Sequence, residues 1–463
     1  MSETAAAVGD DRPEEGYGLS HEMLQAVEEA LDAYNLQDVE KLVVPLHSAV
    51  MADLLEQLHP EDRRTVVGII RPHLIADAEV LTYLDEEVRG QVIELLAPEE
   101  IASALAELDS DDALGVIEGL EEEEREKVLE ALPTAARMFV EEGLTFPEYS
   151  AGRLMQREIV AVPMFWTVGK TIDWLRETEG LPDDFHLIFA VDPMYRPVGS
   201  VRLAHMLRSK RPVKVGAIIS EDIRPIPAEM DQEEVAHQFR QLSLVSAPVV
   251  DKSGRLMGVI TVDDIVDVID EEAEDDLLKM GGVREDDLYR AVVDTTKSRF
   301  AWLGVNLVTA IVASMVIGVF EGTIQQIVAL AVLMPIVASM GGNAGTQSLT
   351  VAVRGIAMRE LTSDNAPRVL WKEVLVGSLN GLIFAVIAAP VAGLWFGDWM
   401  LGLVIGSAMI ITLIAAGFSG ALIPLVLERL KVDPAVASGV FLTTVTDVIG
   451  FFAFLGLAAW ILI

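Results

Sequence analysis

The last thirty residues, 434–463, read PAVASGVFLTTVTDVIGFFAFLGLAAWILI, and Asp447 is the single charged residue among them. The hydrocarbon core of a bilayer is about 30 Å thick, and about 20 mostly apolar residues cross it as a helix. This stretch is long enough and apolar enough to do so. We therefore predict a membrane-spanning helix over Pro434–Ile463.

Four more stretches of this kind precede it. We place them at Phe300–Phe320, Ile324–Val353, Val374–Phe396 and Trp399–Leu427. The alternative is a set of buried helices in a large soluble domain, which would require five helices of this length with almost no polar face. The pattern therefore predicts an α-helical membrane domain with five transmembrane helices over 300–463.

Charge divides the chain at the same place. The 463 residues hold 34 Lys+Arg and 72 Asp+Glu, a net charge of −38, and 28 of those basic and 64 of those acidic residues precede Phe300. An acidic soluble part is thus joined to an apolar block. The acidity argues against nucleic-acid binding. The lack of cysteine excludes a disulfide scaffold, a thiolate zinc site and a cysteine nucleophile.

The loops between the spans predict the orientation. The loops after the second and fourth spans hold six basic residues, namely Arg354, Arg359, Arg368, Lys372, Arg429 and Lys431. Basic loops stay in the cytoplasm, which places the N-terminus in the cytoplasm and Ile463 outside. The first twenty residues are polar and do not resemble a signal peptide. We expect a multi-pass protein of the cell (inner) membrane, in contact with lipid.

Two spans contain polar residues that lipid cannot accommodate. The second holds Gly341-Gly342-Asn343-Ala344-Gly345-Thr346-Gln347-Ser348, whose polar side chains must face protein or water; close packing of small residues is the alternative reading. Asp447 lies midway along the fifth span, where a carboxylate costs about 2.5–3.5 kcal/mol. The other spans offer no Lys or Arg at that depth to pair with it.

A hydrated cation is the counter-charge that best explains Asp447. Thr443, Thr444 and Thr446 lie on the same helix and could bind the water shell of such an ion. A protonated, hydrogen-bonded Asp447 is the alternative. The residues therefore point to a cation pathway.

The soluble part begins with an acidic leader, 1–18, followed by a helical-repeat N domain, 19–148. Acidic clusters recur before apolar helical stretches, as in Pro60-Glu61-Asp62, Pro98-Glu99-Glu100 and Ser110-Asp111-Asp112. Proline and acidic residues suit the first turn of a helix. Short helices joined by tight turns predict a stacked, all-α domain, and nothing in it indicates catalysis.

A duplication follows. Val191-Asp192, Arg196 and Gly199 recur 59 positions later as Val250-Asp251, Arg255 and Gly258. Each copy predicts a helix, two strands joined by a turn, and a second helix. We assign 149–210 and 211–275 to two α/β modules. The helix that leaves the second module carries carboxylates at three- and four-residue steps.

Those carboxylates lie on one face of the predicted helix; they are Asp264, Asp267, Asp270, Glu271, Glu274 and Asp275, with Glu272 and Asp276 in a second row. A solvated acidic face is the usual reading of such a run. Because this helix leads directly to the membrane domain, and oxygen clusters suit hard divalent cations, Mg²⁺ or Ca²⁺ binding is the sharper hypothesis.

The duplicated unit resembles a tandem pair of CBS modules. Thr261 and Asp264 match the Ser/Thr-x-x-Asp signature that often holds the ribose or phosphate of a nucleotide, whereas the first copy, Ser200-Val201-Arg202-Leu203, lacks the Asp. The resemblance implies one nucleotide site at most, with ATP as a possible ligand.

The order of domains, together with the Gly341–Ser348 run, resembles the MgtE family of magnesium channels over about 20–463. The resemblance implies a homodimer with one cation pore, in which Asp447 is the pore carboxylate and Thr443, Thr444 and Asn343 lie beside it. It also implies a plug helix near Glu285–Arg299, within a connecting segment 276–299. The implied Mg²⁺ sensor residues are Asp264, Asp267, Glu272, Asp275, Asp276 and Glu233.

Two positions depart from the family. Ser243 stands where the family has a sensor carboxylate, and Gly439 stands where an Asn often precedes the pore Asp by eight residues. One sensor site and the inner pore mouth therefore differ from the family pattern, whereas the pore carboxylate matches it.

The sequence therefore predicts a Mg²⁺ channel that cytosolic Mg²⁺ closes. A proton- or Na⁺-coupled secondary transporter that uses Asp447 as a relay is the first alternative. A membrane-bound nucleotide sensor that transports nothing is the second. No nucleophile–base pair or phosphate-binding loop points to an enzyme.

Overall fold

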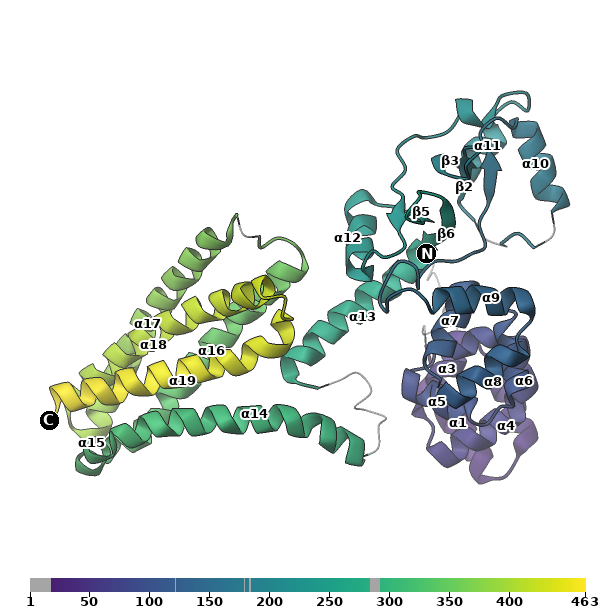
Figure 1. Ribbon diagram of the computed structural model, residues 1–463. Coiled ribbons are helices and arrows are strands. Elements are labelled where there is room, and N and C mark those ends of the chain that lie inside the picture. Colours follow the sequence, from purple (N-terminus) through teal and green to yellow (C-terminus); the bar gives the residue numbers. More distant parts are fainter. Residues whose placement is uncertain (1–17, 121, 179, 183–184, 284–291, 363) are drawn as a thin grey trace, which may run out of the picture. The chain divides into compact units, whose positions relative to one another are not determined.

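The computed structural model describes residues 18–463 except 121, 179, 183–184, 284–291 and 363. It contains two compact units, one ending at Asp270 and the other covering Glu271–Ile463. Helix α13 (Val262–Gly281) begins in the first unit and ends in the second. Figure 1 shows the helices and strands of both units.

The first unit begins with short helices. They are α1 (His21–Asp32), α2 (Leu36–Val43), α3 (Ser48–Gln57), α4 (Pro60–Ala76), α5 (Glu86–Ile93), α6 (Pro98–Leu105), α7 (Ser110–Glu118), α8 (Glu122–Ala131) and α9 (Thr134–Gly143), with a 3₁₀ turn at Ala78–Leu81. Helices α4, α6 and α7 begin at the predicted acidic clusters. The predicted all-α repeat is therefore confirmed.

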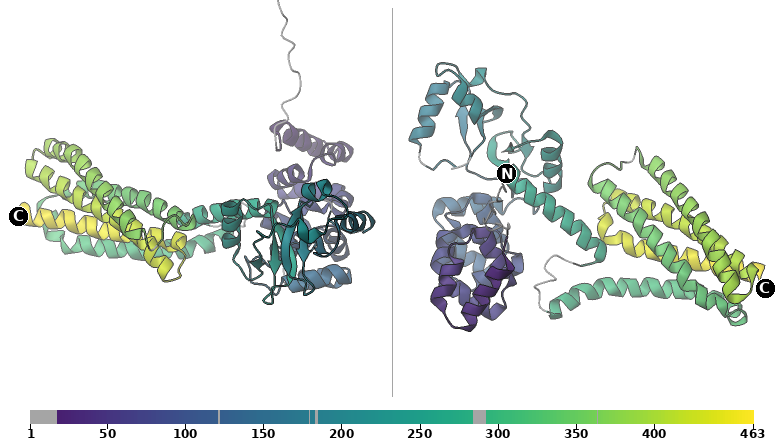
Figure 2. Two further views of the ribbon diagram at one scale, coloured as in Figure 1. Left: turned by 90° about the horizontal axis from the view of Figure 1, so that it is seen from above. Right: turned by 180° about the vertical axis from the view of Figure 1, so that it is seen from behind.

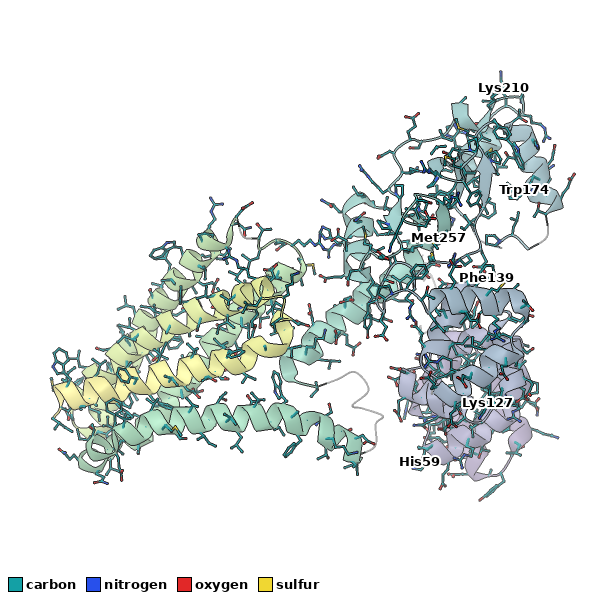
Figure 3. All side chains as sticks on the ribbon, viewed as in Figure 1. His59, Lys127, Phe139, Trp174, Lys210 and Met257 are labelled. Atoms are coloured by element: carbon teal, nitrogen blue, oxygen red, sulfur yellow. The ribbon has the colours of Figure 1, made fainter. Side chains whose placement is uncertain are left out.

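These helices stack because several of them contact the helix two places further along the chain: α2 contacts α4, α4 contacts α6, α6 contacts α8 and α7 contacts α9. Leu54, Leu55, Ile70 and Leu74 lie fully buried between them. The short helices could not bury their apolar faces alone, so neighbouring repeats cover one another. His59 and Lys127 in Figure 3 mark this domain.

The rest of the first unit holds the duplication. Its strands are β1 (Ala161–Pro163), β2 (Leu187–Val191), β3 (Pro197–Arg202), β4 (Ile226–Pro227), β5 (Ser246–Val250) and β6 (Leu256–Thr261), and its helices are α10 (Val168–Glu177), α11 (Leu203–Arg208), α12 (Gln232–Leu242) and the start of α13. They form two three-stranded sheets, β1-β2-β3 and β4-β5-β6.

The sequence repeat of 59 residues is also the structural repeat. The antiparallel pair Leu187↔Arg202 in the first sheet corresponds to Ser246↔Thr261 in the second, and both hairpins carry an irregularity at the same place. Each turn is closed by an aspartate: Asp192 accepts from the N–H of Arg196 at 2.9 Å, and Asp251 from that of Arg255 at 2.8 Å. This geometry confirms the tandem α/β modules.

The second unit contains five helices that are long and apolar enough to cross a membrane. They are α14 (Val292–Val319), α16 (Ala329–Ala357), α17 (Ala366–Phe396), α18 (Trp399–Arg429) and α19 (Pro434–Ile461), and the short α15 (Glu321–Gln326) lies between the first two. The predicted second span therefore begins at Ala329 rather than Ile324. Of the predicted connecting segment, 276–281 belongs to α13 and 292–299 to α14, while 284–291 lies outside the described residues.

Helix α18 is the centre of this bundle. It contacts α16, α17 and α19, and α14 packs along α19. Figure 2 shows the bundle from two further sides. Glycines permit the close approach: a Cβ on Gly417 would lie 2.6 Å from the carbonyl oxygen of Glu373, and one on Gly377 would lie 2.4 Å from that of Leu413. Small residues at helix contacts are what membrane helices use to pack.

A buried carboxylate lies inside the bundle. Glu373 on α17 is 7% exposed, and the hydroxyl of Ser348 on α16 donates a hydrogen bond of 2.7 Å to it. This contact satisfies one polar residue of the Gly341–Ser348 run within the protein, as expected for a group that lipid cannot solvate.

Candidate cation sites

Asp447 is half-buried on α19, and the exposed Thr443 lies one turn before it on the same helix face. The hydroxyls of both predicted threonine partners donate to the backbone: Thr443 to the carbonyl oxygen of Gly439 at 2.8 Å and Thr444 to that of Val440 at 2.7 Å. Because their protons are used in this way, the hydroxyl oxygens can act only as acceptors. Acceptors are what a cation and its water shell require.

The opposite face of α19 is packed against its neighbours. Thr446 is fully buried, and a Cβ on Gly341 of α16 would lie 3.6 Å from the Cβ of Thr446. A Cβ on Gly450 of α19 would lie 3.4 Å from the methyl of Thr412 on α18. This packing fixes the rotation of α19. The face that carries Thr443 is therefore the one that the single chain leaves open.

Helix α16 also has an uncovered polar face. Asn343 is exposed, and its amide donates to the hydroxyl of Ser339 at 3.4 Å. Thr346, Gln347 and Thr350 are exposed on the same helix. No hydrogen bond between Asn343 and Asp447 is present in the described part of the chain.

A second group of carboxylates lies in the first unit, where α7 approaches α13. Asp111 and Asp112 occupy the first turn of α7, and Asp264 occupies the first turn of α13. One oxygen of Asp111 is buried and has no hydrogen-bond partner among the described residues. Asp264 accepts from the N–H of Thr261 at 3.1 Å and from its hydroxyl at 2.7 Å.

Burial and mutual repulsion perturb all three carboxyls. Burial and the negative charge of Asp264 raise the pKa of Asp112 to about 6. Burial, opposed by the Thr261 hydrogen bonds, raises the pKa of Asp264 to about 6. Burial, Asp264 and Asp112 raise the pKa of Asp111 well above its ordinary value. Three acids that resist ionisation together form a place where an added cation would be stabilised.

The linker that precedes the first sheet is tied to the helical domain. The hydroxyl of Ser110 accepts from the N–H of Arg157 at 2.8 Å and donates to Glu158 at 2.9 Å. Arg157 pairs with Glu142 at 3.1 Å, and Arg153 pairs with Glu118. Ser110 directly precedes Asp111, so these bonds hold the first turn of α7 in place beside α13.

A third group lies at the end of α13, in the second unit. Burial and the charge of Asp433 raise the pKa of Asp276. Lys279 pairs with Asp275 and, at 3.1 Å, with Asp433. Glu272 is half-buried one turn before Asp276.

Of the remaining predicted sensor residues, Asp267 lies beside the group of Asp111, Asp112 and Asp264, because its negative charge raises the pKa of both Asp112 and Asp264. Partial burial and the charge of Asp270 raise the pKa of Asp267 itself. Glu233 is exposed in the first turn of α12, and Ser243 ends that helix with a left-handed φ of 52°. Within the described part of this single chain, no three His, Asp or Glu side chains are arranged to enclose a metal ion. A cation bound at any of these groups of carboxylates would keep much of its water shell.

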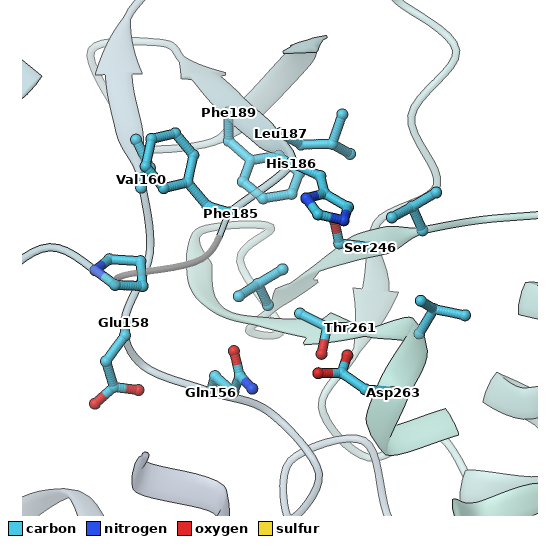
Figure 4. Close-up of a pocket in the computed structure, with 14 residues that line it drawn as sticks. Gln156, Glu158, Val160, Phe185, His186, Leu187, Phe189, Ser246, Thr261 and Asp263 are labelled. Carbon is cyan, nitrogen blue, oxygen red and sulfur yellow. The ribbon is translucent and has the colours of Figure 1, made fainter. Parts of the chain in front are cut away.

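A cavity of about 100 Å³ lies between the two modules. Figure 4 shows Phe185 and Phe189 on one side of it and Thr261 and Asp263 on the other. Of the predicted nucleotide pair, Thr261 lines the cavity, whereas Asp264 is not among its lining residues and belongs to the acidic group beside α7.

Sequence reasoning missed two features of these sites. The sequence pattern identifies Asp111 and Asp112 only as residues that begin a helix, because Asp264, whose charge acts on both, lies about 150 residues further along the chain. Glu373 lies one position before the predicted third span, so its burial was not anticipated. The one feature of the sequence that indicates this burial is that Glu373 is an acidic residue directly beside an apolar run.

Three family models match the chain: "Divalent cation transporter" over 334–457, "MgtE intracellular N domain" over 46–149, and "CBS domain" over 215–271. Among curated proteins, the "Magnesium transporter MgtE" of Thermus thermophilus is 31% identical over 447 residues, covering 91% of this chain and 99% of that protein. The protein of the same name from Bacillus subtilis is 29% identical over 425 residues, covering 91% and 94%.

One similar solved structure is described as "the cytosolic domain of the Mg2+ channel MgtE in complex with ATP". The two are 27% identical, and the match covers 53% of this chain and 99% of the solved structure, with a TM-score of 0.49.

Proposed function

Because the chain belongs to the MgtE family of magnesium transporters, we propose that it is a Mg²⁺ channel whose permeation path passes Asp447 and which cytosolic Mg²⁺ closes. The observation that carries the gating part is the group of Asp111, Asp112 and Asp264. The permeation part is supported by Asp447 and the acceptor oxygens of Thr443 and Thr444.

Permeation follows from the preference of Mg²⁺ for oxygen ligands and its reluctance to lose water. A site that accepts the hydrated ion needs a negative charge and hydrogen-bond acceptors rather than a closed cage. Asp447 supplies the charge, and the threonine oxygens face the water shell. Asn343 on α16 would contribute from the neighbouring helix.

The functional unit in this proposal is a homodimer. The open face of α16 carries Asn343, Gln347 and Thr350, which lipid cannot solvate. A second copy, together with water between the copies, would cover this face and bring two Asp447 side chains to one pathway. The exposed apolar stripe of α13, Val262, Val266 and Ile269, supports a second contact of the same kind.

Closure requires only that Mg²⁺ bind the closed arrangement more tightly than the open one. Without a cation, Asp111 and Asp112 repel Asp264, and α7 and α13 tend to separate. Mg²⁺ bound between them, largely through water, removes this repulsion. The second group, Glu272, Asp275 and Asp276, would respond in the same way, with affinities of about 10⁻⁴–10⁻³ M by analogy with weak Ca²⁺ modules.

The proposal also includes orientation and a nucleotide. In this proposal the first unit lies on the cytoplasmic side of the cell (inner) membrane and Ile463 lies outside, because basic loops stay in the cytoplasm. The cavity of about 100 Å³ between the modules would take only the base of an adenine nucleotide, against Phe185 and Phe189, with the ribose near Thr261. Asp263 replaces Asp264 as the carboxylate at this cavity.

The gating proposal is tested by Asp264→Asn in the full-length protein. Asparagine keeps the acceptor for Thr261 but removes one charge, so we expect a higher melting temperature than wild type without Mg²⁺. We also expect most of the Mg²⁺-induced stabilisation to be lost. A single site gains about 2.7 kcal/mol at a ligand concentration of 100 Kd, so the wild-type increment is measurable by thermal unfolding in detergent.

Asp222→Asn is the matched control, because Asp222 is 84% exposed and loses the same charge. It should shift with Mg²⁺ as wild type does. Equal Mg²⁺ stabilisation of the Asp264→Asn protein and wild type would remove this site from the gating proposal.

A further inference from the structure

The end of α13 is built to a defined geometry rather than left to fray. Gly282 has φ of +68°, its N–H donates to the carbonyl oxygen of Lys279 at 3.0 Å, and the N–H of Val283 donates to that of Leu278 at 3.1 Å. This pair of bonds is the Schellman motif that stops a helix at a left-handed glycine. A Cβ on Gly282 would lie 2.4 Å from the indole of Trp302 on α14, so the helix ends directly against the membrane domain.

The last turn of α13 also packs on the Pro434 end of α19. Met280 contacts a small apolar cluster formed by three of the membrane helices; its buried members are Leu349, Val353, Ala435 and Leu442, with Ile423 at its edge. The main chain at Met280 approaches Gly439, since a Cβ on Gly439 would lie 3.9 Å from the carbonyl oxygen of Met280. The end of α13 thus rests on the helix that carries Asp447.

An ion pair connects the same two elements. Asp433 caps α19 by accepting from the N–H of Ala435 at 2.8 Å through one oxygen, and its other oxygen lies 3.1 Å from the ammonium of Lys279. Lys279 also pairs with Asp275, one turn earlier on α13. The one ammonium of Lys279 thus connects the last turn of α13 to the residue that caps α19.

We propose that Lys279 is a coupling residue that transmits the state of α13 to the N-terminal end of α19 through Asp433. This inference rests on the proposed function, because it concerns the path by which Mg²⁺ in the cytosolic unit closes the pore. Met280 and Trp302 position the last turn of α13, and the Lys279–Asp433 pair makes α19 follow it. Without the pair, the sensor still binds Mg²⁺, but α19 no longer responds.

The test is Lys279→Met in the full-length protein, measured by Mg²⁺ flux into proteoliposomes at low and high Mg²⁺ on the cytoplasmic side. Flux at low Mg²⁺ should equal that of wild type. The Mg²⁺ concentration that halves the flux should rise about 5- to 150-fold, the usual range of an allosteric coupling. The increase in melting temperature caused by Mg²⁺ should persist, because the carboxylates beside α7 are untouched.

Asp433→Asn should behave as Lys279→Met does, since asparagine still caps the helix but lacks the charge. Lys279→Arg should restore inhibition, and Lys41→Met, at a lysine of α2 that is 73% exposed, should change nothing. Normal inhibition of Lys279→Met, or loss of its Mg²⁺ stabilisation, would overturn the coupling role. If wild type itself is not inhibited by Mg²⁺, the gating proposal fails instead.

Discussion

Replacing Asp447 by alanine is expected to reduce Mg²⁺ flux by about 10- to 1,000-fold, the range by which a focused charge raises local ion concentration and entry rates. The variant loses the single carboxylate of α19 that faces the open side of the helix with Thr443. Its packed face, with Thr446 against α16 and Gly450 against α18, is unchanged. Flux into proteoliposomes that hold a Mg²⁺-sensitive dye measures the effect.

Asp398→Asn is the control for this variant. Asp398 caps α18 by accepting from the N–H of Met400 at 2.9 Å, a bond that asparagine also accepts, so it removes an acid of the membrane domain without touching α19. Size-exclusion chromatography should find both variants in the same oligomeric state as wild type. Wild-type flux through a properly assembled Asp447→Ala protein would exclude Asp447 from the permeation path.

The second large effect is expected from neutralising the sensor carboxylates. The variant with Asp264→Asn, Asp267→Asn, Glu272→Gln and Asp276→Asn lacks the carboxylates that form the proposed cation sites along α13. The channel should then conduct at Mg²⁺ concentrations that close wild type, with the inhibitory concentration raised about 5- to 150-fold. Flux measured against cytoplasmic Mg²⁺ gives this number directly.

The structure adds a sharper version of the same experiment. Asp111→Asn with Asp112→Asn changes no residue of α13 but removes the opposing charges on α7, and it should also weaken inhibition. Glu22→Gln with Glu28→Gln removes two exposed charges from α1 and should leave inhibition intact. Inhibition of the four-residue variant at the wild-type Mg²⁺ concentration would refute the assignment of α13 as a sensor.

Much of the fold could be predicted because its signals are local or periodic. Asp192 and Asp251 hold the same place in two copies 59 residues apart, so one copy supports the interpretation of the other. Runs such as Trp399–Leu427 meet the length that a bilayer sets. The start of the second span was misplaced because apolar residues continue across Ile327, whereas the backbone bends there and Glu321–Gln326 forms its own helix.

The sites were less predictable because they depend on contacts between distant residues. The family resemblance identifies Asp264 as a sensor residue, but Asp111 and Asp112, on which its charge acts, belong to the helical domain. Neither spacing nor hydropathy predicts that the two domains meet at these residues. Lys279 and Asp433 are likewise separated by four membrane helices in sequence. Spacing along α13 predicts which carboxylates share a face, but not which of them become buried.

Single-channel recording in a planar bilayer tests the central claim most directly. With equal proton and Na⁺ concentrations on both sides and a Mg²⁺ gradient alone, we expect unitary currents that reverse at the Mg²⁺ equilibrium potential. Their open probability should fall as cytoplasmic Mg²⁺ rises. Transport that stops whenever the proton and Na⁺ gradients are removed, with no unitary current at any Mg²⁺ concentration, would contradict the account and favour a coupled carrier.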